Sequence, residues 1–221
     1  MTRVLKAGRK EPLSGSTRSA VVFLHGYGAN GADLLGLADP LAEHLPDTLF
    51  VAPDAPETIP GMPMGLQWFP IPWIDGSSEE ESERGLIAAA QDLNAFLDAL
   101  MVDEDLLPEQ VVLFGFSQGT MMSLHVAPRR EDELAGVVAF SGRLLAPELL
   151  ADDVLSRPPV MLIHGDQDDV VPVQSLPAAA EALQEAGWKD VYAHVMKGTA
   201  HGIAPDGLSV ALAFMRDKCG L

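Results

Sequence analysis

The sequence predicts an α/β fold in which a mainly parallel sheet is covered by helices on both faces. Short apolar runs alternate along the chain with longer segments whose apolar residues recur at helical spacing. The short runs are apolar throughout rather than alternating, which is typical of parallel strands buried on both sides. The 221 residues contain no linker, repeat or low-complexity tract, so residues 1–221 are expected to form a single domain with one substantial core.

The first quarter of the chain is expected to supply two buried strands, one interrupted helix and one weak edge strand. In order, these are an edge strand at 2–7, a buried strand at 21–24, a helix at 32–44 and a buried strand at 48–52. Pro40 lacks a backbone N–H, so it is expected to bend or split the helix.

Residues 54–76 form a proline-rich segment that is predicted to lack regular structure and to cover a pocket. Six prolines fall between residues 53 and 72, and prolines so dense oppose both helix and sheet. An apolar excursion of this length between elements is usually functional. Its candidate substrate-binding residues are Met64, Trp68, Phe69 and Trp73. The alternative is that these side chains cap the core, because pockets and cores share the same composition.

The rest of the chain reads as alternating helices and strands. Ser78 and Glu81 have the spacing of a capping box, and a long helix with an apolar stripe is expected to follow them. The remaining strands are expected at 111–114, 137–140, 160–163 and 191–196, and the remaining helices at 120–127, 176–185 and 205–218.

Charge and cysteine content limit the possible partners and location. The formal net charge of −18 argues against nucleic acid and anionic membrane surfaces as partners. No apolar run approaches bilayer-spanning length, and residues 1–18 contain no signal-peptide core, so stable membrane insertion is not expected. The single cysteine, Cys219, is expected to be a bystander, and one unpaired cysteine favours the cytoplasm.

The first chemical signal is the pentapeptide at residues 115–119, Gly-Phe-Ser-Gln-Gly. It lies between a predicted strand and a predicted helix, which is the context that a G-x-S-x-G nucleophile turn requires. There the hydroxyl of Ser117 would stand clear of the sheet at a helix N-terminus, where free N–H groups favour negative charge. Ser117 as an ordinary helix N-cap is the structural alternative.

Acids and a histidine follow two other strands at the same expected edge of the sheet. Asp166, Asp168 and Asp169 follow the strand at 160–163, and His201 follows the strand at 191–196. Carboxyl ends of parallel strands meet at one edge, so these groups are expected near Ser117. From spacing alone the three aspartates remain alternatives, because such turns are rich in aspartate for local reasons.

The other histidines are expected to be structural. His194 lies within a strand, and His25 and His164 each precede a glycine directly after a strand, where shaping the loop is the favoured role. No histidines have the H-E-x-x-H spacing, so no metal is expected.

Together these residue types suit nucleophilic acyl transfer. A serine needs a base within hydrogen-bond reach, a histidine can take and return that proton, and a carboxylate fixes the imidazole. The developing oxyanion needs two preset donors, expected to be the backbone N–H groups of Gln118 and Tyr27. Glycines around Tyr27 would allow the backbone to approach the substrate.

Five motifs together resemble the phospholipase/carboxylesterase family of α/β-hydrolases, which includes the acyl-protein thioesterases. They are His25–Gly28, Pro53–Pro56, Gly115–Gly119, His164–Pro172 and His201–Ile203, and the resemblance spans nearly the whole chain. It implies the α/β-hydrolase fold, Ser117 as nucleophile, Asp168 as the acid and His201 as the base. It also implies that no cofactor is used and that a homodimer can form.

The resemblance implies a serine carboxylesterase that hydrolyses short- to medium-chain carboxylic esters. Eukaryotic thioesterases of the family have Gly-Asp where Gly28-Ala29 stands here, and this difference favours a small-ester carboxylesterase. An acyl-protein thioesterase or lysophospholipase is the alternative within the same class. A non-catalytic binding module on the same fold is the alternative outside it.

Overall fold

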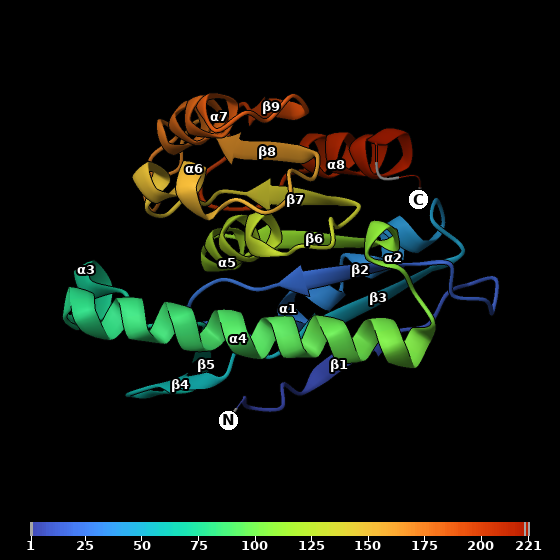
Figure 1. Cartoon of the computed structure of the whole chain (residues 1–221), viewed down its shortest axis with the longest axis horizontal. Coiled ribbons are helices and arrows are strands. Elements are labelled where there is room, and N and C mark those ends of the chain that lie inside the picture. The colour runs from blue at the N-terminus through green and yellow to red at the C-terminus, as the bar shows by residue number, and fades with distance from the viewer. Residues whose placement is uncertain (1, 219, 221) are drawn as a thin grey trace.

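The computed structural model describes residues 2–218 and residue 220, and it contains a seven-stranded sheet in the order β1-β3-β2-β6-β7-β8-β9. Its strands are β1 (Ala7–Lys10), β2 (Ser19–Leu24), β3 (Thr48–Pro53), β6 (Val111–Phe116), β7 (Gly136–Phe140), β8 (Val160–Gly165) and β9 (Val191–Met196). Only the pairing of β1 with β3 is antiparallel among these strands. Figure 1 shows the strands in this order from β9 at the top to β1 at the bottom. The mainly parallel sheet is as predicted.

Helices cover both faces of the sheet. One face is packed by α4 (Glu79–Glu104), α5 (Gln118–Val126) and α7 (Ser175–Glu185), and the other by α1 (Gly31–Leu35), α2 (Ala38–Ala42) and α8 (Pro205–Lys218). Successive strand residues point to opposite faces, so Val22 and Leu113 join the first cluster while Phe23 and Phe114 join the second. The strands are therefore buried on both sides, which explains their continuous apolar runs.

Two of the expected elements have different bounds. The edge strand is Ala7–Lys10 rather than residues 2–7. It is held by backbone pairing with β3, although it has no large apolar side chain and is mostly exposed. The helix expected at 32–44 is split into α1 and α2, with Pro40 in the first turn of α2. Short 3₁₀ helices lie at Pro108–Gln110, Ala127–Arg129 and Pro147–Leu149, and α6 spans Leu150–Asp153. Cys219 lies outside the described residues.

The proline-rich segment does form regular structure, which corrects the prediction. It contains a two-stranded antiparallel hairpin, β4 (Glu57–Ile59) with β5 (Met62–Gln67), followed by the short helix α3 (Pro72–Asp75). Pro63 is tolerated because it lies in an exposed part of a hairpin strand rather than inside a sheet. Pro72 begins α3, where its missing N–H removes no helical hydrogen bond.

The long helix α4 begins with the predicted capping box. Ser78 Oγ accepts from the backbone N–H of Glu81, and the Glu81 carboxylate accepts from the N–H of Ser78. By length and hydropathy α4 is the one helix in the described part of the chain that could cross a membrane. Its buried residues, among them Leu93 and Leu97, pack on the sheet, so here it is a core helix.

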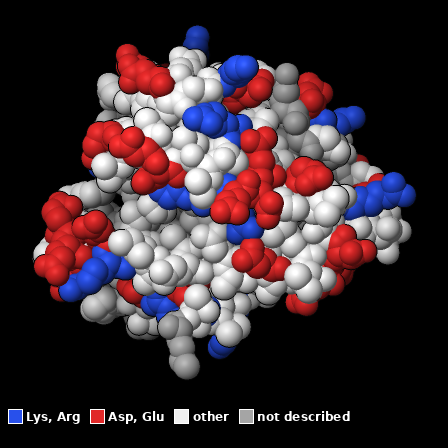
Figure 2. All heavy atoms as spheres, in the orientation of Figure 1, with Lys and Arg blue, Asp and Glu red and all other residues white. Residues whose placement is uncertain are grey.

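Acidic side chains predominate on the face shown in Figure 2, as the net charge of −18 leads one to expect. Basic residues are scattered among them and form no continuous basic stripe on that face. The excess of acidic side chains makes the electrostatic potential of that face negative.

A buried carboxylate on α4 is neutralised by the N-terminal arm. Asp92 is 3% exposed, and it accepts from both the backbone N–H and the guanidinium of Arg3 at 2.6 Å. The same guanidinium reaches the Glu57 carboxylate on β4 at 3.1 Å. Arg3 therefore joins α4 to the hairpin.

The substitution Arg3→Met is expected to lower the free energy of unfolding by about 2 kcal/mol, because it leaves the buried Asp92 carboxylate without its cation. Partial exposure of Arg3 keeps the loss below that of a fully buried pair. Urea unfolding measures the loss. The control Arg84→Met breaks an exposed ion pair with Glu80 and should change stability by less than about 0.5 kcal/mol. Equal losses in the two variants would contradict this role for Arg3.

Candidate active site

Ser117 occupies a strained turn between β6 and α5. Its φ and ψ are 54° and −114°, a backbone conformation that non-glycine residues rarely adopt. A Cβ on Gly115 would collide with the backbone at Gly119, and a Cβ on Gly119 would collide with the carbonyl oxygen of Leu24. Both glycines are thus required for the turn to pass this close to α5 and β2.

The hydroxyl of Ser117 is not used to cap α5. Ser117 is the N-cap residue, but its side chain makes no capping hydrogen bond. Its backbone N–H donates instead to Phe140 O at 2.9 Å, which fixes the turn against the end of β7. A serine held in a strained conformation without a capping role is available for chemistry.

His201 and Asp168 form a close pair at the carboxyl edge of the sheet. His201 Nδ1 lies 2.7 Å from Asp168 Oδ2, and the Asp168 side chain is fully buried while that of His201 is 17% exposed. The His201 ring lies 4.9 Å from the ring of Phe116, the residue before Ser117. His201 therefore lies close to the turn that carries Ser117.

The second oxygen of Asp168 is held by the backbone. Asp168 Oδ1 accepts from Val170 N at 3.0 Å and Val171 N at 2.8 Å. Burial alone would raise the pKa of this carboxyl, but the hydrogen bonds from His201, Val171 and Val170 outweigh it and hold the pKa below its ordinary value. An ionised carboxylate at this position orients the imidazole so that Nδ1 carries the proton and Nε2 is the free base.

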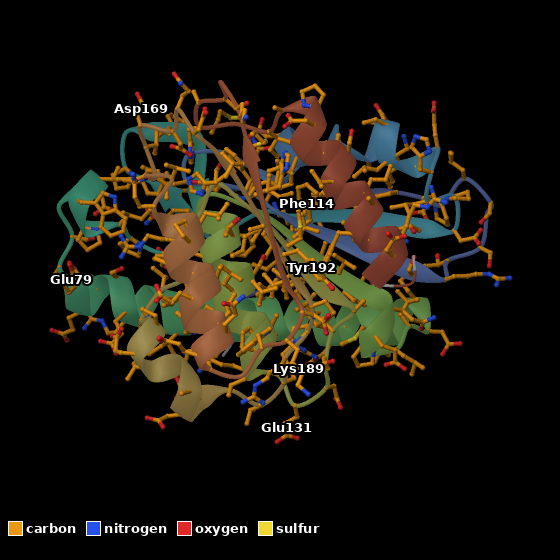
Figure 3. All side chains as sticks on the ribbon, turned by 90° about the horizontal axis from the view of Figure 1, so that it is seen from above. Glu79, Phe114, Glu131, Asp169, Lys189 and Tyr192 are labelled. Carbon is orange, nitrogen blue, oxygen red and sulfur yellow. The ribbon has the colours of Figure 1, made fainter. Side chains whose placement is uncertain are left out.

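The two competing aspartates lie elsewhere. Asp166 is exposed and accepts from the backbone N–H of Gly198 at 2.7 Å, so it closes a turn. Asp169 is exposed at the outer end of the β8 loop, at the opposite end of the sheet from Glu131 and Lys189 (Figure 3). Of the three aspartates, only Asp168 lies against histidine side chains, those of His201 and His164.

His25 shapes its loop, as expected. It is fully buried, its Nε2 accepts from Ala55 N at 2.9 Å and its Nδ1 donates to Gly26 O at 2.8 Å. Burial lowers the pKa of His25, which keeps the ring neutral and suited to accept from Ala55. His194, also expected to be structural, pairs with Asp206 at the start of α8.

His164 holds the turn that carries Asp168. Its Nε2 donates to Val171 O at 2.8 Å and lies 3.3 Å from Asp168 Oδ2, and the residue is 2% exposed. The turn from 168 to 171 is therefore tied back to the end of β8.

Replacing His164 by leucine is expected to lower the free energy of unfolding by about 1–3 kcal/mol, because the carbonyl of Val171 loses its buried donor. Chemical denaturation measures this. The exposed His44 offers a matched control, and His44→Leu should be nearly neutral. An equally small effect at both positions would show that the His164 hydrogen bond does not matter.

Two backbone N–H groups near Ser117 have no acceptor. Within residues 2–218, neither the amide of Tyr27 nor that of Gln118 donates to another residue. A Cβ on Gly26 would lie 3.2 Å from Ser117 Cβ, which shows how close the loop after β2 comes to the serine. Two free donors beside a serine hydroxyl could stabilise an oxyanion formed there.

The four candidate pocket residues separate into two pairs. Trp68 and Phe69 are 0% and 2% exposed and pack within the core cluster. Met64 and Trp73 are exposed, and the Trp73 ring lies 4.9 Å from the Arg143 guanidinium. Only the second pair can meet a ligand from solvent.

A groove of about 570 Å³ lies between the hairpin and the beginning of α4, with Gln67, Pro70 and Arg84 in its lining. None of Ser117, Asp168 and His201 lines this groove. Among the described residues, no cluster of three or more His, Cys, Asp and Glu side chains is arranged to hold a metal.

Sequence reasoning missed the side chain of Gln118. The motif directed attention to its backbone N–H, but its side chain is fully buried and bonds to the backbone at Trp68 and Phe69. A glutamine inside an apolar segment, directly after the serine of the motif, was the available signal, because a buried amide requires partners.

Comparisons with known proteins agree with the fold and the motifs. The model of the phospholipase/carboxylesterase family matches residues 11–218. Acyl-protein thioesterase 1 of Saccharomyces cerevisiae is 30% identical, over 90% of this chain and 92% of its own length. Acyl-protein thioesterase 1 of Gibberella zeae is 28% identical, over 97% and 98%. The crystal structure of esterase PE8 is 41% identical, with a TM-score of 0.92, and the match covers 98% of this chain and 100% of that one.

Proposed function

The chain belongs to the phospholipase/carboxylesterase family of α/β-hydrolases, and we propose that it is a carboxylesterase for short- to medium-chain esters that acts through Ser117, His201 and Asp168. That it is a serine hydrolase acting on esters follows from the family. The observation that carries the finer proposal is the 2.7 Å pair of His201 and the buried Asp168, beside a serine held at φ 54°.

The proposed reaction has two steps. His201 Nε2 takes the proton of Ser117 as Oγ attacks the acyl carbonyl, and the amides of Tyr27 and Gln118 hold the oxyanion. The tetrahedral intermediate then expels the alcohol, which receives the proton from His201, and leaves an acyl-serine. Water attacks the acyl-serine by the same route, releases the acid and restores the hydroxyl. Asp168 stabilises the imidazolium in both steps.

A thioesterase acting on acylated proteins is the second candidate, and the curated relatives called acyl-protein thioesterase 1 favour it. The same residues would serve, because a thioester also passes through a tetrahedral oxyanion. The two candidates differ only in leaving group and acyl length.

A substrate panel decides between them. We expect kcat/KM for p-nitrophenyl esters to be highest at short to medium acyl length, and to exceed that for acyl thioesters and lysophospholipids of the same acyl group. A higher kcat/KM for long-chain acyl thioesters would make the thioesterase the better description. Absence of turnover across the whole panel would contradict both.

A further inference from the structure

The hairpin strand β5 is bonded to the loop that carries one of the two free amides. Gly28 N donates to Leu66 O, and Leu66 N donates to Ala29 O, both at 2.9 Å. This reciprocal pair holds the backbone directly after Tyr27. The Tyr27 amide is therefore positioned from one side by β5.

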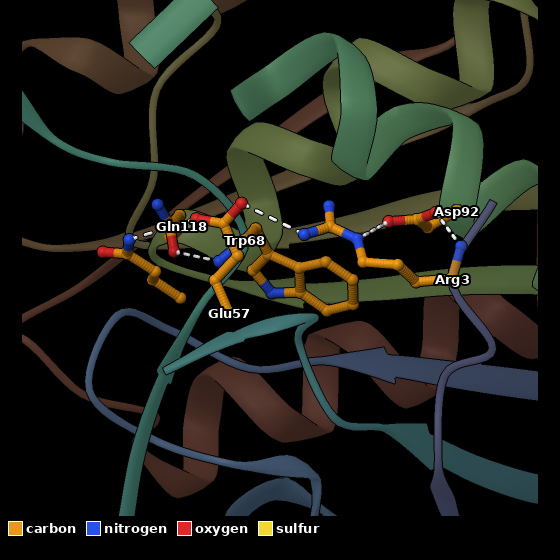
Figure 4. A network of polar contacts seen from close by, with 6 residues as sticks. Arg3, Glu57, Trp68, Asp92 and Gln118 are labelled. Carbon is orange, nitrogen blue, oxygen red and sulfur yellow. Dashed lines mark hydrogen bonds and ion pairs between the residues drawn. The ribbon is translucent and has the colours of Figure 1, made fainter. Parts of the chain in front are cut away.

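The residues directly after β5 are bonded to the residue that carries the other free amide. The side chain of Gln118 accepts from Trp68 N at 3.0 Å through Oε1 and donates to Phe69 O at 2.7 Å through Nε2. Gln118 and Trp68 are both fully buried, and Figure 4 shows the amide facing the backbone at Trp68. Only one orientation of the amide fits, because Trp68 N requires an acceptor and Phe69 O requires a donor.

A third hydrogen bond strengthens the same connection. Trp68 Nε1 donates to His25 O at 2.9 Å, and the Trp68 and His25 rings lie 5.6 Å apart. Residues 66–69 thus contact the end of β2, the loop after it and the turn at Ser117. This short stretch links the two backbones that present free N–H groups.

We propose that the side chain of Gln118 is a positioning residue that sets the separation of the two oxyanion donors. Its hydrogen bonds hold residues 68–69 against the turn that carries the backbone N–H of Gln118. Leu66 bonds the same stretch to the loop that carries the backbone N–H of Tyr27. The proline-rich segment is then a fixed scaffold for the oxyanion site rather than a loop that only covers a pocket. The inference rests on the proposed function.

The consequence is an effect on the transition state rather than on substrate binding. Donors stabilise an oxyanion only when they are held where its charge develops. The carbonyl of a bound, unreacted ester interacts only weakly with these donors. Loss of the Gln118 side-chain hydrogen bonds should therefore lower kcat and kcat/KM equally and leave KM nearly unchanged. A merely structural glutamine would give no such pattern.

The contact of Arg3 with the hairpin supplies a matched control. Arg3 joins Asp92 to Glu57 on β4 (Figure 4). Gln67 Nε2 donates to the other oxygen of Glu57 at 3.3 Å. Arg3→Met loosens the same hairpin but removes none of the hydrogen bonds that Gln118, Trp68 and Leu66 make. It should destabilise the protein without a change in kcat.

The first experiment compares Gln118→Met with Arg3→Met in the full chain, using p-nitrophenyl butyrate and an alkyl trifluoromethyl ketone, which forms a tetrahedral adduct with a reactive serine. We expect Gln118→Met to lower kcat by about tenfold to a hundredfold, with KM within about twofold. The inhibition constant of the ketone should rise by the same factor. An unchanged kcat and ketone affinity, or equal losses in Arg3→Met, would overturn the proposal.

The second variant, Gln118→Glu, preserves shape and tests the donor alone. Its protonated carboxyl can accept from Trp68 N and donate to Phe69 O, whereas the ionised form has no donor. Burial raises the pKa of such a carboxyl. We therefore expect the ratio of variant to parent kcat to fall as pH rises from 6 to 9. A ratio that does not change with pH would contradict the positioning role of the Gln118 side chain.

Labelling of the parent separates this inference from the proposed function. If a fluorophosphonate fails to label Ser117 in the parent, the proposed function fails and the inference fails with it. If the parent is labelled and turns over esters but both Gln118 variants behave like the parent, only the inference is wrong.

Discussion

Replacing Ser117 by alanine is expected to lower kcat for p-nitrophenyl butyrate by a factor on the order of 10⁵, because no acyl-enzyme can form. Oxyanion donors and substrate binding would still give some acceleration over water, so the residual rate need not be zero. Initial rates at saturating ester measure the loss, with circular dichroism to show that the fold is retained.

Ser123 provides the matched control for that variant. It is also a buried serine on α5, and its hydroxyl donates to Gly119 O at 2.9 Å rather than facing the carboxyl edge. Ser123→Ala should reduce stability modestly and leave kcat within a few-fold of the parent. Substantial turnover by Ser117→Ala, with a slower Ser123→Ala, would mean that the nucleophile has been misidentified.

The substitution Asp168→Asn is expected to lower kcat by a factor on the order of 10⁴, since an amide facing His201 Nδ1 favours the wrong tautomer. The imidazole would then present a protonated Nε2 to the serine and could not act as its base. Asp169→Asn, one residue along the same loop but exposed, should leave kcat nearly unchanged. The ratio of kcat in these two variants tests the assignment.

A larger loss at residue 169 than at residue 168 would contradict the geometry of the His201 pair. Similar, small losses at both would mean that His201 acts without a carboxylate partner.

The low pKa of Asp168 also makes the stability of the fold depend on pH. A depressed carboxyl pKa stabilises the fold above the unfolded pKa, and this contribution is lost as pH falls through the folded pKa.

The sheet and the edge that carries the polar groups could be predicted because the signals are local. Strands such as Val111–Phe116 and Val160–Gly165 are buried on both faces, so their apolar runs are visible in sequence. The carboxyl ends of parallel strands lie at the same edge of a sheet, so the sequence predicts that Ser117 and His201 lie close together. The capping box at Ser78 depends on only four residues and was also predictable.

The hairpin at 57–67 was not predictable in the same way. Its pairing depends on contacts with distant residues, among them Gly28, Ala29 and Gln118, that leave no local pattern. Proline content suggested irregular structure, but Pro63 falls where a hairpin strand tolerates it. Burial of Trp68 follows from the same long-range contacts, so its composition alone left core and pocket equally open.

The choice among the aspartates shows where local reasoning ended. Spacing left Asp166, Asp168 and Asp169 as alternatives, and only the family resemblance favoured Asp168. The structure adds the physical reason: Asp168 is buried and faces His201, whereas Asp166 and Asp169 are exposed. Turn geometry of this kind is set by backbone N–H groups, here those of Val170 and Val171, which sequence does not reveal.

Fluorophosphonate labelling followed by mass spectrometry of the intact protein and its peptides tests the central claim most directly, because only an activated serine reacts. The account predicts one adduct per chain, located on the peptide that contains Ser117, and much slower labelling in His201→Ala. No adduct would identify a non-catalytic binding module on this fold, and an adduct at any other residue would contradict the assignment of the nucleophile.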